Sequence, residues 1–326
     1  MISIITIIIV IVLIIMKTIL VTGGTGLVGQ AIRDISKQYT YTFFFIGSKD
    51  CDLTDIEETR KLFNTIRPDY VIHLAACVGG VFKNIHCKVD MYEQNIIINY
   101  NVLKICHEVK VSKVISCLST CIFPDTTTYP INETMLHNGP PHTSNNAYAY
   151  AKRMLEVHSK AYQDQYNDNF ICVIPTNIYG PHDNFSLEDG HVIPSLIHRC
   201  YINRQQSEPF TIRGSGKPLR QFIFSKDLAH LLMWTLISYN DRDSLILSVD
   251  ETDEISIKNI AEYIADAYNY SNNIWFDTSY TDGQYKKTAD NSKLMNMIGE
   301  FSFTPIEIGI RETVKWFISN NKHCRK

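Results

Sequence analysis

The chain has 326 residues, of which 45% are apolar and 20% are charged, enough for one large α/β domain with a smaller lobe. A formal charge of −3 and a pI of about 6.4 exclude nucleic acid as a main partner, because such a partner needs a broad basic surface. Nine cysteines without a Cys-x-x-Cys pair fit neither a disulfide framework nor a zinc site. We therefore expect a reducing, cytoplasmic compartment and no bound metal.

Residues 1–15 form an uncharged apolar run that is shorter than the roughly 20 residues of a membrane-spanning helix. The run lacks the basic start and the small-residue cleavage site of a signal peptide. Met16-Lys17 resembles an ordinary chain start. We expect residues 1–15 to be an extension outside the fold; a weak membrane anchor is the alternative.

Apolar runs alternate with amphipathic segments through the first half of the chain, which indicates parallel strands joined by right-handed helical crossovers. This pattern predicts a doubly wound parallel sheet of the Rossmann type. Helices are expected to begin near residue 55 and after Asn146. The predicted strands are 18–21, 42–46, 70–74, 113–118 and 170–174.

The sequence changes character after Pro175, where loops rich in Gly, Pro, His and Asp begin. A helix over 226–239 and a strand over 245–249 are expected to return to the main sheet. We therefore predict a dinucleotide-binding domain formed by 16–178 and about 222–250, and a substrate-binding lobe formed by 179–221 and 251–326.

A glycine motif, Gly23-x-x-Gly26-x-x-Gly29, follows the first predicted strand and opens a helix. Backbone N–H groups and the helix dipole at such a turn bind a pyrophosphate, so we expect a dinucleotide here. The contacting residues would be Gly23, Gly24, Thr25, Gly26, Leu27, Val28 and Gly29.

The end of the second strand bears on which dinucleotide binds. Ser48 and Lys49 precede Asp50, so no acid stands directly at the strand end. A hydroxyl and an ammonium can hold a 2′-phosphate, whereas a carboxylate would repel it. This favours NADPH. The alternative is that Ser48 and Lys49 are only solvated turn residues.

Tyr148 and Lys152 are one helical turn apart, and Ser119 follows the fourth predicted strand. A nearby ammonium is expected to lower the tyrosine pKa and make Tyr148 a proton donor to a reduced carbonyl oxygen, which Ser119 also binds. The alternative is a chance Tyr-x-x-x-Lys on a tyrosine-rich helix. The order of glycine loop, Ser119 and Tyr148 favours catalysis.

Two further residues have acid–base potential. Cys121 is two positions beyond Ser119, and a thiol near a cation can act as a base near neutral pH, although most buried cysteines are simply small hydrophobic residues. His191 is a candidate partner acid.

Isolated positive charges in the second lobe, Arg199, Arg220 and one of Lys286 or Lys287, suit a nucleoside diphosphate, although each alone is typical of a surface charge.

The chain resembles the extended short-chain dehydrogenase/reductases across residues 17 to about 322. The matching motifs are Thr22–Gly29, His73–Gly80, Ser119–Pro124, Tyr148-x-x-x-Lys152, Pro175–Asn184, His191–Pro194 and Asp282-Gly283-Gln284.

Within this family, the resemblance implies conversion of GDP-4-keto-6-deoxy-D-mannose to GDP-L-fucose by 3,5-epimerisation and NADPH-dependent reduction, in a homodimer. It implies catalytic roles for Ser119, Cys121, Tyr148, Lys152 and His191. Further cofactor contacts would come from Asp52, Leu53, Lys152, Pro175, Thr176, Asn177, Ile178 and His191, and substrate contacts from Arg199, Arg213, Arg220 and Asp282. Arg213 stands where the family commonly has tryptophan.

Two alternatives remain open at this stage. A sugar-nucleotide 4-epimerase or 4,6-dehydratase would recycle a tightly held NAD and consume no NADPH. A catalytically silent dinucleotide sensor would bind NADP without turnover, which the presence of Ser119, Tyr148 and Lys152 disfavours.

Overall fold

The computed structural model describes residues 16–326 except 272 and 283. The apolar segment 1–15, expected to lie outside the fold, falls outside the described residues. In the described part of the chain, six parallel strands form the main sheet in the order β10-β5-β4-β3-β1-β2. These strands are β1 (Thr18–Thr22), β2 (Thr42–Ile46), β3 (Tyr70–His73), β4 (Lys113–Cys117), β5 (Phe170–Pro175) and β10 (Leu245–Leu247).

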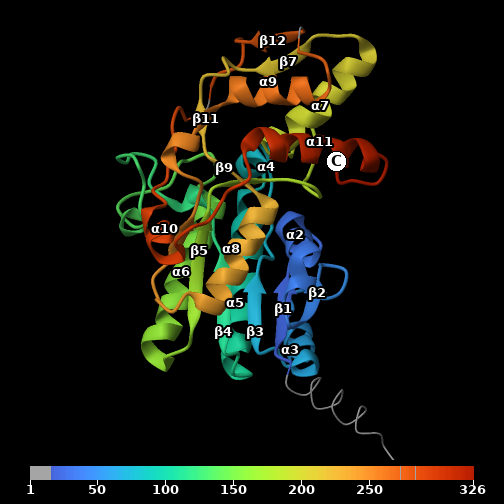
Figure 1. The fold of residues 1–326 in the computed structure, drawn as a ribbon. Helices are drawn as coiled ribbons and strands as arrows, with labels where there is room; N and C mark the ends of the chain where they lie inside the picture. Colours follow the sequence, from blue (N-terminus) through green and yellow to red (C-terminus); the bar gives the residue numbers. More distant parts are fainter. Residues whose placement is uncertain (1–15, 272, 283) are drawn as a thin grey trace, which may run out of the picture.

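The predicted doubly wound parallel sheet is confirmed. Helices cover both faces of the sheet (Figure 1), since the strands are apolar on both sides. On one face lie α2 (Leu27–Ile35), α8 (Ser225–Ser238) and α10 (Ser292–Ile298). On the other face lie α3 (Ile56–Ile66), α5 (Lys88–Glu108) and α6 (Asn146–Tyr166).

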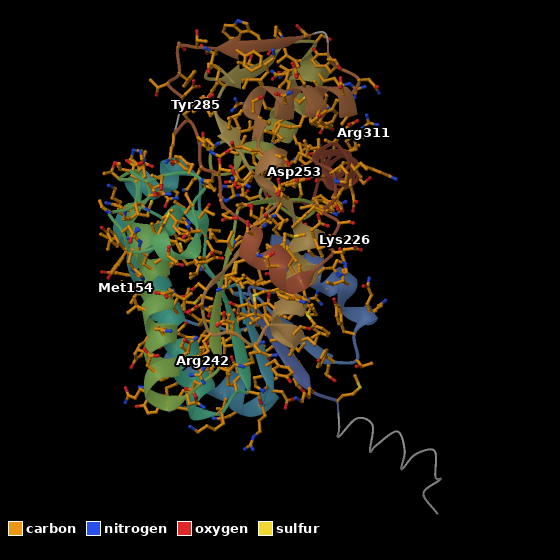
Figure 2. All side chains as sticks on the ribbon, turned by 60° about the vertical axis from the view of Figure 1, so that its left-hand side comes forward. Met154, Lys226, Arg242, Asp253, Tyr285 and Arg311 are labelled. Atoms are coloured by element: carbon orange, nitrogen blue, oxygen red, sulfur yellow. The ribbon has the colours of Figure 1, made fainter. Side chains whose placement is uncertain are left out.

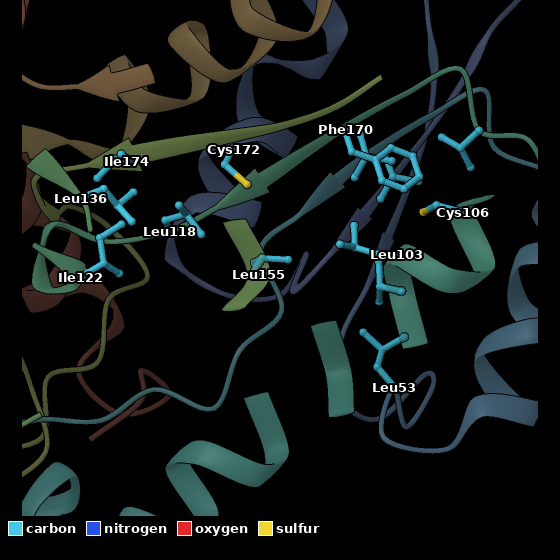
Figure 3. Packing of buried hydrophobic residues seen from close by; sticks show 14 of the residues in the cluster. Leu53, Leu103, Cys106, Leu118, Ile122, Leu136, Leu155, Phe170, Cys172 and Ile174 are labelled. Carbon is cyan, nitrogen blue, oxygen red and sulfur yellow. The ribbon is translucent and has the colours of Figure 1, made fainter. Parts of the chain in front are cut away.

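Alternating side chains on each strand feed these two apolar layers. On β1, Ile19 and Val21 pack toward α2 and α8, whereas Leu20 packs into the opposite layer. In that opposite layer, Leu103 of α5 and Leu155 of α6 approach the sheet (Figure 3). The sheet is therefore buried on both faces, and only its strand ends are open to a ligand.

The chain runs from β1 to β2 on one side and then crosses to β3 on the other, so the connection reverses direction at β1. Such a reversal leaves a crevice at the carboxyl ends of the strands, where ligands bind in open parallel sheets. The helix α3 begins beside this edge, where the Asp55 carboxylate accepts the N–H groups of Glu57 and Glu58 at 2.7 and 3.0 Å.

A second lobe stands above the main sheet (Figure 1) and has its own apolar core. Its elements include α7 (Val192–Gln206), β7 (Phe210–Arg213), β8 (Leu219–Arg220), β11 (Ile255–Ser256), α9 (Ile257–Ala267), β12 (Ile274–Asp277) and α11 (Ile306–Asn320). The pair β6 (Asn177–Tyr179) and β9 (Phe222–Phe224) connects the two parts. The remaining helices are η1 (Ser36–Gln38), α4 (Val81–His86), η2 (Thr120–Ile122), η3 (Glu133–Met135) and η4 (Glu251–Asp253).

No helix in the described range, 16–326 without 272 and 283, combines the length and apolar character needed to cross a bilayer.

Candidate active site

A cavity of about 740 Å³ opens at the carboxyl ends of β1, β3, β4 and β5. It brings together most of the residues predicted to bind cofactor or to catalyse. The predicted residues that line it are Gly23, Thr25, Gly26, Leu27, Val28, Gly29, Ser48, Asp52, Leu53, Ser119, Tyr148, Lys152, Pro175, Thr176, Asn177, Ile178 and His191. A smaller cavity of about 460 Å³ between α9 and α11 lies away from these residues.

The glycine loop fits a dinucleotide pyrophosphate. Gly23 has a φ of +68°, a conformation that L side chains rarely adopt, and its carbonyl accepts the Gly26 N–H at 3.0 Å. A Cβ on Gly29 would lie 2.5 Å from the Gly24 Cα. No side chain caps the start of α2, so the N–H groups of its first turn remain available to an anion.

The loop after β2 supplies a different part of the cavity. Ser48 lines it, whereas Lys49 is exposed and does not, and Gly24 is likewise absent from the lining. The Asp50 carboxylate accepts the Gly47 N–H at 2.8 Å. The Asp52 carboxylate is engaged by the N–H and hydroxyl of Thr54, which lowers its pKa.

Ser119, Tyr148 and Lys152 converge at the inner end of the cavity. Ser119 follows β4, and its hydroxyl accepts the Cys121 N–H at 3.4 Å. The Lys152 ammonium donates to the Cys117 carbonyl oxygen at 2.8 Å and lies 5.9 Å from the centre of the Tyr148 ring. A hydroxyl, a phenol and an ammonium therefore border one space beside the glycine loop.

The expected lowering of the Tyr148 pKa is wrong for this structure. Burial raises the pKa of Tyr148 well above its ordinary value, and neighbouring thiols raise it further. The Lys152 ammonium donates to the Cys117 carbonyl, and burial lowers its own pKa. Tyr148 is consequently a neutral phenol with a proton to donate.

Cys121 is buried and adjoins this cavity without lining it. Its sulfur is close enough to Tyr148 and Lys152 to perturb both pKa values. It also faces Lys287, whose pKa burial lowers and the nearby sulfur raises. Lys287 makes no hydrogen bond or ion pair within the described residues, whereas Lys286 pairs with Glu254 at 3.4 Å. The structure thus separates these two lysines, which the sequence left as alternatives.

His191 immediately precedes α7 and lines the cavity. Its side chain is exposed toward that space, yet the surrounding protein desolvates the imidazole and lowers its pKa. The ring is therefore neutral at pH 7.

The four predicted substrate residues do not line the cavity. Arg220 donates to the Leu219 and Gln284 carbonyl oxygens, each at 2.6 Å. Asp282 accepts the N–H and the hydroxyl of Ser215 at 2.8 and 2.5 Å.

The Arg213 guanidinium lies 4.9 Å from the centre of the Tyr280 ring. Burial lowers the pKa of the half-buried Arg199, and the charge of Arg213 lowers it further. These two guanidinium groups are near each other without a carboxylate within ion-pair distance in the described range.

No cluster of three or more His, Cys, Asp or Glu side chains suited to a metal ion occurs in the described residues. The nine cysteines are free thiols.

Residues 19–246 match the NAD dependent epimerase/dehydratase family. A GDP-L-fucose synthase of Dictyostelium discoideum is 54% identical, with 95% of this chain and 98% of that protein covered. The chain belongs to this family, within its GDP-L-fucose synthase group. A probable GDP-L-fucose synthase of Drosophila melanogaster is 49% identical over 95% of this chain and its own full length.

A solved member of the family has the same fold. The crystal structure of a GDP-L-fucose synthetase from Naegleria fowleri bound to NADP superposes with a TM-score of 0.92 at 50% identity, covering 95% of each chain.

Two further residues, which the sequence did not predict as site residues, line the cavity of the present chain. Asp183 is buried, and Arg325 reaches the cavity from the segment after α11. Asp183 belongs to the Gly180–Asn184 stretch, whose polar residues were a usable signal. Arg325 carried no local signal at all.

Proposed function

We propose that this chain is an enzyme that converts GDP-4-keto-6-deoxy-D-mannose to GDP-L-fucose by 3,5-epimerisation followed by NADPH-dependent reduction at C4. The observation that carries the proposal is the convergence of Ser119, Tyr148 and Lys152 on the cavity formed by the glycine loop. The near full-length similarity to two GDP-L-fucose synthases specifies the sugar nucleotide.

In the reduction, Ser119 and Tyr148 bind the C4 carbonyl oxygen of the substrate. The bound cofactor supplies the hydride that C4 accepts. Tyr148, whose phenol is protonated at neutral pH, donates its phenolic proton to the resulting oxyanion. Lys152 fixes the geometry by its bond to the Cys117 carbonyl and places a positive charge beside the phenol.

In the epimerisation, the same C4 ketone acidifies the C–H bonds at C3 and C5. Cys121 removes a proton on one face of the sugar, and Lys287 lies near its sulfur. His191, whose ring is neutral at pH 7, takes up a proton from solvent and delivers it on the other face. Ser119 and Tyr148 stabilise the enediolate oxygen, so one oxygen-binding pocket serves both stages.

The nucleoside diphosphate is assigned to the second lobe. Arg199 and Arg213 lie near each other and without a carboxylate partner among the described residues, as a diphosphate site requires. Arg220 stands between this lobe and the Cys121 region, where its charge also lowers the pKa of Lys287. Asp282 holds the Gly214–Gly216 turn through its bonds to Ser215.

This assignment divides the chain by function. Residues 16–178 with about 222–250 supply most of the cofactor cavity, and residues 179–221 with 251–326 supply the sugar-nucleotide site, while His191 and Arg325 from this second part also line the cavity and α10 packs on the main sheet. The strands β1 to β5 and β10 of the main sheet support the first part, and the separate apolar core of the second lobe supports the other.

We also propose a homodimer formed through α5 and α6. Both helices expose apolar side chains at helical spacing: Tyr92 and Tyr100 on α5 are 41% and 45% exposed, and Met154 and Val157 on α6 are 39% and 43% exposed. Met154 stands on the outer side of α6 (Figure 2). The rings of Tyr100 and His158 stack at 5.7 Å, which joins the two stripes into one surface that a second copy would cover.

A cytoplasmic location is proposed because free thiols, eight of them within the first two hundred residues, persist in a reducing compartment.

The test is an incubation of the purified chain with GDP-4-keto-6-deoxy-D-mannose and NADPH. The expected product is GDP-L-fucose, with one NADPH oxidised per sugar. A 4-epimerase or dehydratase would change the sugar without net NADPH oxidation, and a silent sensor would leave both reactants unchanged.

A further inference from the structure

The cavity needs positive charge to hold a phosphorylated dinucleotide, and few of its lining residues supply it. Lys152 lies at the inner end, where its ammonium is bound to the Cys117 carbonyl and serves Tyr148. Asp52, Asp183 and Asp189 add carboxyl groups to the lining. Apart from Lys152, the Lys or Arg side chain that lines the described cavity is Arg325.

Arg325 is held in place by the loop that it covers. Its carbonyl oxygen accepts the Phe185 N–H at 2.9 Å, and its guanidinium donates to the His182 carbonyl oxygen at 2.9 Å. Just before it, Cys324 packs against the core of the second lobe. The guanidinium is therefore positioned before any ligand binds, and its remaining N–H groups can donate to a ligand.

Arg325 also lies on the same side as the phosphate-binding turn. The segment after α11 lies above α2 (Figure 1), the helix whose first turn lines the same cavity. Burial lowers the pKa of His182, to whose carbonyl Arg325 donates, and Asp34 of α2 is close enough to oppose part of that shift. No carboxylate in the described range lies within ion-pair distance of the Arg325 guanidinium.

Asp183 is close enough to Arg325 for their charges to interact; it is 4% exposed, it lines the cavity, and its Oδ2 has no hydrogen-bond partner among the described residues. Its Oδ1 accepts the Asn184 N–H at 2.7 Å. An unpartnered buried polar atom on a residue that lines a ligand cavity is consistent with a ligand group that completes it.

We propose that Arg325 binds a phosphate group of the dinucleotide held in the cavity that it shares with the glycine loop. The inference rests on the proposed function, since it adds a cofactor-binding residue to the same site. A guanidinium can donate two parallel bonds to phosphate oxygens, and its positive charge offsets the carboxyl groups of the cavity lining. Both the pyrophosphate and the 2′-phosphate offer this chemistry.

The test is direct titration of cofactor fluorescence without substrate, on wild type, Arg325→Ala, Arg325→Lys and the control Lys326→Ala. Lys326 carries the same charge on the adjacent residue, but its ammonium lies 5.8 Å from the Phe317 ring and not in the cavity lining. Arg325→Ala should weaken NADPH binding on the order of tenfold to a hundredfold. The NADPH affinity of Arg325→Lys should lie between those of wild type and Arg325→Ala, and the affinity of Lys326→Ala should match that of wild type.

Two measurements identify which cofactor phosphate Arg325 binds and whether it acts through its charge. Equal weakening of NADPH and NADH assigns the pyrophosphate, and weakening of NADPH alone assigns the 2′-phosphate. The ratio of wild-type to Arg325→Ala affinity should shrink as KCl is raised, because a charge contact is screened. A salt-independent ratio, or a loss in Arg325→Lys as large as in Arg325→Ala with a lowered Tm in both, would mean that Arg325 only supports the loop.

Wild-type affinity in Arg325→Ala overturns this inference alone. Failure of the wild type itself to bind NADPH overturns the proposed function as well, so the two failures are distinguishable.

Discussion

The cofactor cavity and the second lobe present their ligand groups in opposite ways. In the cavity, much of the surface offered to a ligand comes from the backbone of the strand ends, the glycine turn and the uncapped start of α2. In the second lobe, the groups are long side chains, and Arg220 and Asp282 are already bonded within the protein. A site built from backbone is set by the fold, whereas a site built from side chains depends on each contact separately.

The largest effect is expected for Tyr148→Phe, which keeps the ring and removes the proton donor of the cavity. Reduction should slow by roughly 10²- to 10⁴-fold, the usual contribution of a positioned general acid. NADPH binding should be unchanged, because the glycine loop is untouched. Stopped-flow or steady-state absorbance of NADPH measures the rate. Tyr150→Phe, on the exposed side of the same helix, is the matched control, and a fast Tyr148→Phe variant would refute the assignment of the acid.

Asp183 lies on the loop where the two regions meet, and burial raises its pKa to about 7 from 3.8. The folded state then binds a proton that the unfolded state has already released, so stability falls as pH rises from about 4 to 7. Asp183→Asn removes this penalty. Its free energy of unfolding should exceed that of wild type by up to about 4 kcal/mol above pH 7, with no gain below pH 4.

Urea unfolding of both proteins at several pH values, without cofactor, measures this difference. An advantage of Asp183→Asn that stays constant from pH 4 to 8 would contradict the assignment of a protonated Asp183.

The glycine turn tests whether the cavity depends on backbone shape. In Gly29→Ala the new Cβ would meet the Gly24 Cα at 2.5 Å, so the turn or the start of α2 must shift. Overpacking of this kind destabilises by about 1–3 kcal/mol, and NADPH affinity should fall with it. In the control Gly139→Ala, the Cβ would have its nearest neighbour at 3.4 Å. Thermal unfolding and cofactor titration check both, and equal behaviour of the two variants would argue against a rigid turn.

The smallest effects are expected in the second lobe, where Arg220 and Arg213 differ in burial. Arg220→Gln should raise the KM for the sugar nucleotide and lower Tm, because the guanidinium also ties the Gln284 carbonyl. Arg213→Gln should raise KM only a few-fold at most, since it removes an exposed cation from the Tyr280 ring. Initial rates at varied substrate measure both. A larger effect of Arg213 would show that it has taken over the role of the tryptophan common at this place in the family.

The sequence was informative where local pattern determines position. Strand spacing predicted the main sheet, and the glycine motif and Tyr148-x-x-x-Lys152 predicted residues that do line one cavity. Ser48 was predicted together with Lys49, but residues next to each other in a turn diverge, and Lys49 is directed elsewhere.

Contacts between distant segments could not be predicted in the same way. The bond from Lys152 to the Cys117 carbonyl joins α6 to the end of β4, and the burial of Tyr148 in the same region raises its pKa instead of lowering it. Arg325 reaches the cavity only because the segment after α11 folds back onto His182, which is 143 residues away in the chain. Neither contact could be predicted from the spacing of residues along the chain.

The central claim is that one cavity performs both inversion and reduction, with Cys121 as the base. The most direct measurement is an incubation in D₂O followed by NMR of the product. Wild type should incorporate deuterium at C3 and C5 and form GDP-L-fucose. Cys121→Ser should incorporate far less at both carbons and yield a reduced sugar that keeps the D-manno configuration there. Full deuterium incorporation and GDP-L-fucose from Cys121→Ser at the wild-type rate would contradict the account.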